Sequence, residues 1–460
     1  MKTSEIIKSK SDLCKGCNRC VRECPMEAVN VTYLDDAGNI KVRIDQEKCI
    51  GCGRCISACK HDARYYEDDI KWFFNDLKNG VPISLIAAPS IRTNIPEYKK
   101  LFTYLKQLGV KKIFDVSLGA DICIWAHVRL IEKNGAQPLI TQPCPAIVNY
   151  CKIYSHDLLK YLSPVHSPMA CTSVYIKNYR GIKDRIAAIS PCIVKKSEFE
   201  HTGLADYSIT FSGILEYLHE NDISLPEEET EFDHEESGLG SLFPMPGGLK
   251  ENLEFFAGNI HIDDETGEAG GTNGRSLRIA KAEGFSVYRK LDDYAATPEG
   301  MLPDVFDVLN CIEGCNIGTA VSQEAGVFDI IRTMDDSKAR ALRHRDREQL
   351  DAVYKAYDET LDYADFTRRY RPFKSVYPHI DDEDIENAFA LMGKNTYEQQ
   401  NIDCSACGSD TCYGMARKIA LGVNIPINCM VKSVEDARTE HEKYIKANEQ
   451  LVAAVESFKG

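Results

Sequence analysis

The sequence has no long apolar run and fewer positively than negatively charged residues. No stretch approaches the roughly 20 apolar residues that span a bilayer, and residues 1–5 carry no signal-peptide hydrophobic region. Lysine and arginine number 55 against 70 aspartates and glutamates, which gives a net charge of −15. Such a balance argues against nucleic acid or an anionic membrane as a partner. We therefore expect a cytoplasmic protein.

A disulfide framework is not expected either, although the chain has 19 cysteines. The cytosol keeps thiols reduced, and 460 residues are far more than a disulfide-stapled secreted domain contains. Sixteen of the cysteines fall in metal-ligand spacings, and the other three, Cys123, Cys151 and Cys171, are interpreted as small buried hydrophobes. The length also exceeds a single core of roughly 250–300 residues, so several domains are predicted.

The first cysteine group repeats. The run Cys14-x2-Cys17-x2-Cys20-x3-Cys24 recurs thirty-five residues later with the same spacing. This pattern is typical of two-cluster ferredoxins, in which the fourth cysteine of each run binds the other 4Fe-4S cluster. Zinc, the alternative metal, would not explain the doubling. The predicted ligands are Cys14, Cys17, Cys20 and Cys59 for one cluster, and Cys49, Cys52, Cys55 and Cys24 for the other.

Between the two runs, residues 29–33 and 40–44 alternate apolar and polar positions around a turn, which predicts two paired strands. A helix is predicted at Asp69–Leu77. We expect an α+β ferredoxin-like domain over residues 1–79.

From residue 80 the sequence pattern changes to short apolar runs that alternate with helical stretches. Strands are predicted at 82–88, 112–116, 138–141 and 185–190, and helices at 96–108 and 121–134. This alternation favours an α/β domain with mainly parallel sheets over residues 80–395. Because chemistry in such sheets gathers at the carboxyl ends of strands, Cys144 and Cys192 stand where a ligand is expected.

Three stretches of this domain carry cysteines. They are Thr141–Pro145, Pro191–Glu198 and Cys311–Cys315, and together they offer four thiolates and Lys195. Four cysteines suffice for one 4Fe-4S cubane or for zinc, but a zinc site would not ask for a lysine three residues after a ligand.

The three stretches resemble the signature motifs of the diiron (FeFe) hydrogenases, which read Thr-Ser-Cys-Cys-Pro, Met-Pro-Cys-x2-Lys-x2-Glu and Glu-x-Met-x-Cys-x3-Cys-x2-Gly. The resemblance covers about residues 1–395. It implies two lobes with parallel sheets around an H-cluster, in which Cys144, Cys192, Cys311 and Cys315 hold the cubane. Cys315 would also bridge to a diiron unit with carbonyl, cyanide and dithiolate ligands, and Lys195 would hydrogen-bond a cyanide.

The chain also departs from that family. Pro143 stands where productive members have a proton-transferring cysteine, and two glutamates of the proton path correspond to His127 and Leu130. His127 could still relay a proton. The two methionines beside the diiron unit correspond to Ser190 and Leu309. These departures predict slow turnover with the cofactor retained, as in the sensory branch of the family.

The last cysteine group, Cys404-x2-Cys407-x4-Cys412-x16-Cys429, resembles a 4Fe-4S module attached to sensory hydrogenases, with zinc as the alternative. We expect a small helical iron-sulfur module over residues 396–435. A terminal helix is predicted over 436–460, with Leu451, Val452, Val455 and Phe458 forming an apolar stripe that packs on the protein itself or pairs in a homodimer.

The resemblance thus implies an FeFe-hydrogenase-type oxidoreductase that interconverts dihydrogen with protons and electrons and senses hydrogen. Its cofactors would be the H-cluster and three further 4Fe-4S clusters, and its partner a ferredoxin or a signalling protein. The alternatives are a hydrogenase-like iron-sulfur assembly or scaffold protein without the diiron unit, and an ordinary catalytic hydrogenase subunit.

Overall fold

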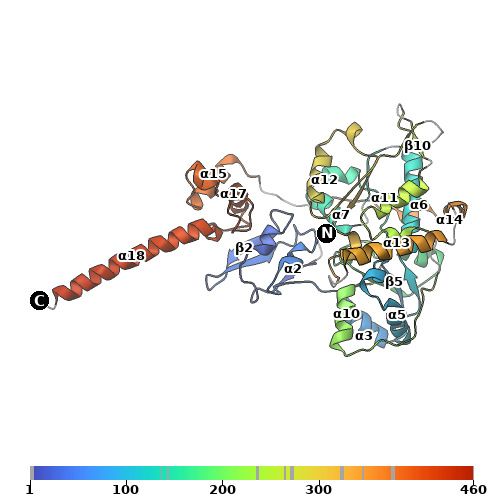
Figure 1. Cartoon of the computed structure of the whole chain (residues 1–460), viewed down its shortest axis with the longest axis horizontal. Coiled ribbons are helices and arrows are strands. Elements are labelled where there is room, and N and C mark those ends of the chain that lie inside the picture. Colours follow the sequence, from blue (N-terminus) through green and yellow to red (C-terminus); the bar gives the residue numbers. More distant parts are fainter. Residues whose placement is uncertain are drawn as a thin grey trace. The chain divides into compact units, whose positions relative to one another are not determined.

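The structure is a computed structural model that describes residues 5–135, 137–141, 144–234, 238–258, 260–263, 266–269, 274–321, 326–343, 347–373 and 379–458. The chain divides into two compact units (Figure 1). Unit 1 comprises Met1–Ile6, Ile50–Cys52 and Tyr66–Lys374, and unit 2 comprises Ile7–Cys49, Gly53–Tyr65 and Ser375–Gly460. No described helix is long and apolar enough to cross a membrane.

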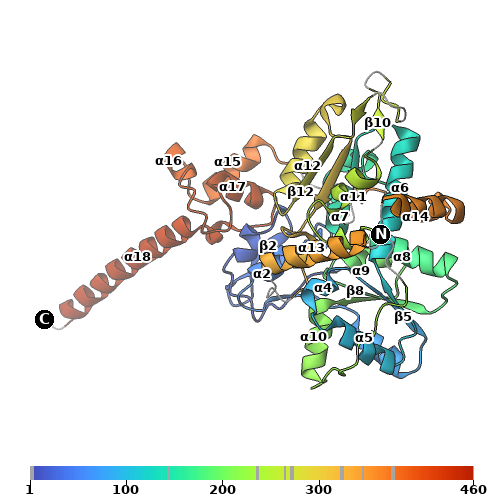
Figure 2. The same cartoon turned by 45° about the vertical axis from the view of Figure 1, so that its right-hand side comes forward.

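Unit 1 is an α/β structure with two parallel sheets, as the sequence predicted. The first sheet has the order β6-β5-β8-β9, all parallel, and the second has the parallel order β12-β13-β7. Figure 2 shows them in separate halves of the unit. The strands are β5 (Ile83–Ala87), β6 (Ile113–Asp115), β7 (Leu139–Thr141), β8 (Arg185–Ser190), β9 (Tyr207–Thr210), β12 (Ile279–Glu283) and β13 (Val305–Leu309), and β10 (His261–Ile262) pairs antiparallel with β11 (Arg275–Ser276).

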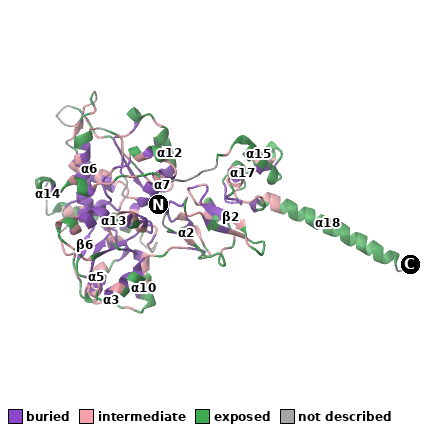
Figure 3. Ribbon diagram, turned by 180° about the vertical axis from the view of Figure 1, so that it is seen from behind, coloured by how far each residue is buried: buried purple, intermediate pink, exposed green. Residues whose placement is uncertain are grey.

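Helices cover both sheets and supply most of the core. The longest in the middle of the unit, α6, is buried on nearly every face because it packs against α8 and lies inside a cluster of apolar side chains (Figure 3). The helices are α3 (Ile70–Lys78), α4 (Ile91–Asn94), α5 (Tyr98–Gln107), α6 (Ser117–Asn134), α7 (Pro145–Ile153), α8 (Pro168–Val174), α9 (Lys195–Thr202), α10 (Phe211–Glu220), α11 (Gly248–Phe256), α12 (Val287–Ala296), α13 (Val327–Arg343) and α14 (Arg347–Thr360). Shorter turns are η1 (His156–Lys160), η2 (Tyr175–Tyr179), η3 (Gly240–Leu242), η4 (Glu299–Met301), η5 (Gly314–Ile317) and η6 (Tyr363–Phe366).

Unit 2 joins the ferredoxin-like region to the C-terminal cysteine region. The predicted strand pair is present as an antiparallel hairpin of β2 and β3. Its elements are β1 (Lys8–Ser9), α1 (Arg19–Arg22), β2 (Asn30–Leu34), β3 (Ile40–Ile44), α2 (Arg54–Ala58), β4 (Arg64–Tyr65), α15 (Asp382–Leu391), α16 (Tyr397–Gln400), α17 (Cys412–Ala420), η7 (Pro426–Asn428) and α18 (Met430–Ser457).

The two regions of unit 2 are tied by polar contacts. Asn18 Nδ2 donates to Asn428 Oδ1 (2.7 Å), and Asn428 Nδ2 donates back to Asn18 Oδ1 (3.2 Å). Arg417 pairs with Glu27, with Nε 3.0 Å from Oε1. The sequence treats residues 1–79, 396–435 and 436–460 as separate modules, and those boundaries remain predictions.

Candidate cofactor site

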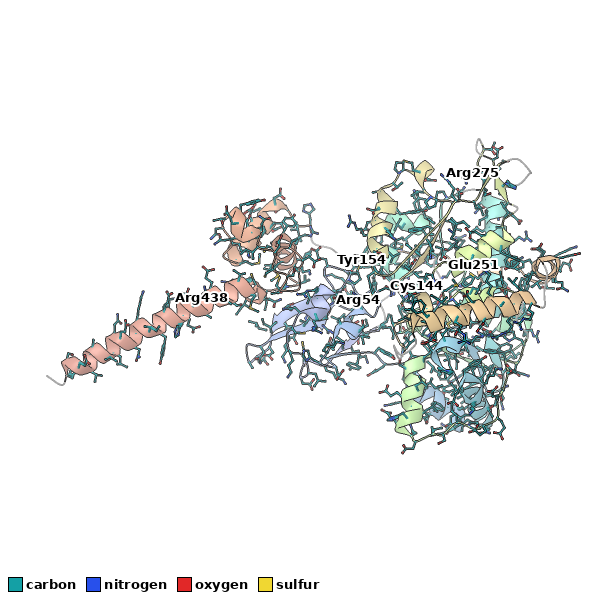
Figure 4. All side chains as sticks on the ribbon, in the orientation of Figure 1. Arg54, Cys144, Tyr154, Glu251, Arg275 and Arg438 are labelled. Carbon is teal, nitrogen blue, oxygen red and sulfur yellow. The ribbon has the colours of Figure 1, made fainter. Side chains whose placement is uncertain are left out.

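The central cysteines stand just beyond the carboxyl ends of parallel strands. Cys144 follows β7 and is the N-cap of α7, Cys192 follows β8, and Cys311 and Cys315 follow β13. Figure 4 labels Cys144 within unit 1. Parallel sheets gather such positions at one edge, so ligands that are far apart in the sequence can meet there.

All four cysteines line one cavity of about 80 Å³. Lys195, Ser190 and Leu309 line it as well, so the structure brings together seven of the residues that the sequence analysis singled out. The rest of the wall is mainly apolar, with alanine, proline and phenylalanine side chains. Pro143 lies outside the described residues.

Burial and the neighbouring cysteines favour the protonated thiol at Cys192, Cys311 and Cys315. Burial, followed by the neighbouring cysteines, raises the pKa of Cys311 well above its ordinary value, and the same causes raise the pKa of Cys315 to about 12. The pKa of Cys192 rises to about 11, mainly through burial. Bound metal deprotonates coordinating thiols outright, and the positive charge of an iron cluster would offset the mutual repulsion of the four thiolates. The donor set therefore fits a cubane of four thiolates.

Lys195 is held by a buried charge network. Its Nζ lies 2.5 Å from Glu198 Oε2 and 3.0 Å from Ser167 Oγ. Arg368 Nη2 lies 3.3 Å from Glu198 Oε1. Burial opposes ionisation of Glu198, but Lys195 and Arg368 together keep the pKa of this carboxyl below its ordinary value. The network fixes a lysine ammonium at the wall of the cavity.

Close approach of the Cys311–Cys315 loop to Pro244 depends on Gly314. This residue has φ +62°, and a Cβ there would lie 2.1 Å from Pro244 O. The next residue, Cys315, donates its N–H to the same carbonyl (2.7 Å). A side chain at position 314 would therefore push Cys315 away from the other cysteines.

Asn310 connects two candidate ligands. Its Nδ2 lies 3.2 Å from Cys52 O and 3.5 Å from Cys311 Sγ, and its Oδ1 accepts from Tyr288 (2.7 Å). Cys52 and Cys311 thus share one amide side chain, which the sequence analysis did not single out.

His127 does not line the cavity among the described residues. It is buried, its Nε2 lies 2.8 Å from Ser163 Oγ, and its Nδ1 lies 2.7 Å from Cys123 O and 3.6 Å from Cys123 Sγ. Burial disfavours the Cys123 thiolate, but contacts with Cys171 and His127 lower its pKa to about 6. Cys123, Cys151 and Cys171 are buried, as predicted, but Cys123 belongs to this polar network rather than to a purely apolar core.

The C-terminal cysteines also converge. Cys404, Cys407, Cys412 and Cys429 line a small cavity of about 10 Å³ in unit 2. Burial, and then the neighbouring cysteines, raise the pKa of Cys407. Around the N-terminal runs, Arg64 Nη2 lies 3.4 Å from Cys20 Sγ, which offers a cation to the predicted cluster there. Among the described residues, no three His, Cys, Asp or Glu side chains are arranged to hold a single metal ion.

Comparison with known proteins places the chain among iron-sulfur proteins. Residues 13–63 match the 4Fe-4S dicluster domain. Iron hydrogenase 1 of Clostridium pasteurianum is 30% identical over 309 residues, which are 57% of this chain and 54% of that protein. The cytosolic Fe-S cluster assembly factor NAR1 of Vanderwaltozyma polyspora is 27% identical over 162 residues, 32% of this chain and 30% of that protein. The chain thus spans about half, or less, of the length of these relatives.

A solved structure supports a hydrogenase-like fold for this chain. A variant of the FeFe-hydrogenase HydA1 from Chlamydomonas reinhardtii superposes with a TM-score of 0.50 at 19% identity, covering 67% of this chain and all of that one. Residues 81–319, more than half of the sequence, match the iron only hydrogenase large subunit, C-terminal domain. The chain therefore belongs to the family of iron-only hydrogenases.

Proposed function

We propose that this protein is an FeFe-hydrogenase-type oxidoreductase that interconverts H2 with protons and electrons at an H-cluster, turns over slowly and senses hydrogen. The observation that carries the proposal is the single cavity lined by Cys144, Cys192, Cys311, Cys315 and Lys195. Family membership supports the redox chemistry, and the departures around the cavity support the slow turnover.

In this proposal the four cysteines would hold the cubane, and Cys315 would also hold the diiron unit. When bound, the H-cluster would supply an iron site for H2, accepting electrons when H2 is split and donating them when H2 forms. Lys195 supplies a fixed ammonium that orients an anionic ligand, because a charge-assisted hydrogen bond is strong in a buried site. Glu198 and Ser167 keep that ammonium in place.

Slow turnover is supported by the side chains available for proton transfer. Pro143 has no exchangeable proton, and Leu130 is buried in the apolar core around α6. His127 retains a hydrogen bond to Ser163 but does not reach the wall of the cavity among the described residues. A positioned acid or base typically contributes ~10²–10⁴-fold to a rate, so its loss suits a sensor better than a productive enzyme.

Three further 4Fe-4S clusters would supply electrons, bound by the eight N-terminal cysteines and by Cys404, Cys407, Cys412 and Cys429. The redox partner would be a ferredoxin or a signalling protein. Asn310 supports a link between the predicted ligand Cys52 and the central site, because its side chain touches both Cys52 O and Cys311 Sγ.

Replacing Asn310 by alanine is expected to lower the reduction potential of the central cubane. Hydrogen bonds to cluster sulfurs favour the reduced, more negative state, so losing one should shift the potential downward by on the order of tens of millivolts. A redox titration followed by electron paramagnetic resonance measures the shift. Asn221→Ala, on the exposed end of α10, serves as the matched control, and an equal shift in both variants would contradict the assignment.

An iron-sulfur assembly protein is the second candidate, supported by the similarity to the assembly factor NAR1. Lys195 at the wall of the cavity favours the hydrogenase, since four cysteines alone suffice for a cubane without a diiron unit. Infrared spectra after loading with the diiron cofactor distinguish the two candidates. Metal-bound carbonyl and cyanide bands are expected, together with about 18 iron atoms per chain for four cubanes and one diiron unit. If the carbonyl and cyanide bands are absent while the cubanes are intact, the result would favour the assembly protein.

We also propose that α18 pairs with a second copy of the chain. Every residue of this 28-residue helix is at least partly exposed, and Figure 3 draws most of it as exposed. A lone helix gains little stability in water without packing of an apolar face. Along it, a seam alternates spacings of four and three residues. The seam comprises Met430, Val434, Ala437, His441, Tyr444, Asn448, Leu451, Val455 and Phe458.

This spacing is that of a coiled coil. Charged side chains along the helix stand mostly off the seam, and Asn448 occupies the kind of core position where asparagine fixes register and favours two strands. Leu451→Asp is expected to convert a dimer into a monomer by placing a charge in the seam. Light scattering after size-exclusion chromatography measures the mass. Ala453→Asp, on the opposite face, should leave the dimer intact, and a monomeric wild type would refute the pairing.

A further inference from the structure

A second cavity of about 520 Å³ lies in unit 1 behind the lysine of the cofactor site. Residues of α7, α8, α9 and the segment 365–371 line it. Glu198 lines this cavity while its partner Lys195 lines the cofactor cavity, so one ion pair stands between the two. The proposed hydrogen chemistry assigns no role to this second cavity.

The wall of the second cavity is rich in positive charge. Lys152, Arg368, Arg369 and Arg371 face two carboxylates, and both of those are already engaged. Glu198 bonds Lys195 and Arg368, and Asp365 accepts from Tyr179 (2.8 Å). An excess of cations is unusual in a chain whose net charge is −15.

Three of these cations have no carboxylate partner among the described residues. They are Lys152, Arg369 and Arg371. The Lys152 ammonium lies 3.9 Å from the centre of the Phe373 ring. Burial and the charge of Arg368 lower the pKa of Lys152 to about 8, which is the response of a lysine that lacks a counterion. An anion bound in the cavity would supply this counterion.

His166 adds an unused polar group to the same wall. It is only 8% exposed, and its Nδ1 has no hydrogen-bond partner among the described residues. A buried imidazole nitrogen without a partner costs free energy, so its presence beside unpaired cations indicates a ligand that completes the site.

We propose that this cavity binds a small organic oxyanion through phosphate or carboxylate oxygens. Arginine forks match both groups bidentately, and Lys152 adds a point charge. Pro145, Val148 and Leu204 offer an apolar surface for the carbon skeleton. The volume lies within the range of roughly 300–1,000 Å³ that small-molecule sites occupy.

Binding of an anion in this cavity would affect the cofactor site through Arg368. An anion on the guanidinium competes with Glu198, whose other partner is Lys195, so it alters the hydrogen bonding of that lysine. This coupling rests on the proposed function, whereas the binding itself does not. The site would then make the response to hydrogen depend on a second metabolite.

Calorimetry with pyrophosphate and, separately, citrate tests the binding, on the 460-residue chain carrying its 4Fe-4S clusters but no diiron unit. Saturable binding of at least one anion is expected, and the better ligand identifies the phosphate or the carboxylate class. Lys152→Gln and Arg371→Gln should each weaken it by about tenfold or more, since each removes a charged contact. Lys160→Gln, an exposed lysine outside the cavity, should leave it unchanged.

Absence of saturable binding by both anions, or equal affinity in all three variants, would overturn the site. The coupling is tested on the protein loaded with the diiron unit, where the bound anion should shift the cyanide bands of the infrared spectrum. Unshifted bands with intact calorimetric binding would overturn the coupling alone. Absence of the carbonyl and cyanide bands altogether would count against the proposed function. It would not affect the binding site, because the calorimetry uses protein without the diiron unit.

Discussion

Pro143→Cys is expected to raise the rate of H2 evolution by about 10²–10⁴-fold, the contribution of a positioned proton-transfer group. The substituted thiol would stand directly before Cys144, whose side chain lines the cofactor cavity. A cysteine there offers an exchangeable proton that proline cannot. The measurement is the H2 evolution rate with a reduced dye, per diiron unit found by infrared spectroscopy.

Pro143→Ala is the matched control for that variant. Alanine removes the proline ring and its restricted φ but adds no proton donor, so its rate should stay near that of the wild type. If alanine accelerates the reaction as much as cysteine does, backbone relaxation and not proton supply limits the rate. A wild type already as fast as productive hydrogenases would refute the slow-turnover proposal.

Glu198→Gln is expected to have the largest effect on stability, about 3–5 kcal/mol in the free energy of unfolding. The carboxylate side chain is 1% exposed and is the counterion of both Lys195 and Arg368, so its neutralisation leaves two buried cations uncompensated. The variant should also retain less of the diiron unit, because Lys195 loses the partner that holds it. Chemical unfolding and infrared band intensity measure the two effects.

Glu220→Gln, an exposed change of the same kind at the end of α10, should alter the unfolding free energy by less than about 0.5 kcal/mol. Equal unfolding midpoints for the two variants would refute the role of the buried network. A pH series adds an independent check. Since the folded-state pKa of Glu198 lies below its ordinary value of 4.5, its contribution is present at neutral pH and is lost as the pH falls through that lowered pKa.

Much of unit 1 could be predicted from local patterns. The strands over 82–88, 112–116, 138–141 and 185–190 are present within two residues of their predicted bounds, because short apolar runs between helical stretches are a strong local signal. The convergence of Cys144 and Cys192 follows from the rule that parallel strands end at one edge. Resemblance to a family added Cys311, Cys315 and Lys195 to the same site.

Other features depend on contacts between distant segments and leave no local pattern. Arg368 reaches Glu198 from 170 positions away in the chain, and arginines in a polar segment do not indicate by themselves which carboxylate they contact. The link from Asn310 to Cys52 spans 258 positions. The polar network at Cys123 also escaped prediction, since a single cysteine on an apolar helix is most often only a small buried side chain.

The pairing of Asn18 with Asn428 sets an order of folding. The two asparagines are 410 positions apart, so at a typical rate of about 5–20 residues per second the ribosome adds the second roughly 20–80 s after the first. Closing so long a flexible loop would cost about 5 kcal/mol. Prior folding of the intervening residues of unit 1 shortens the flexible part of that loop. The joined unit should therefore form only after Asn428 has been synthesised.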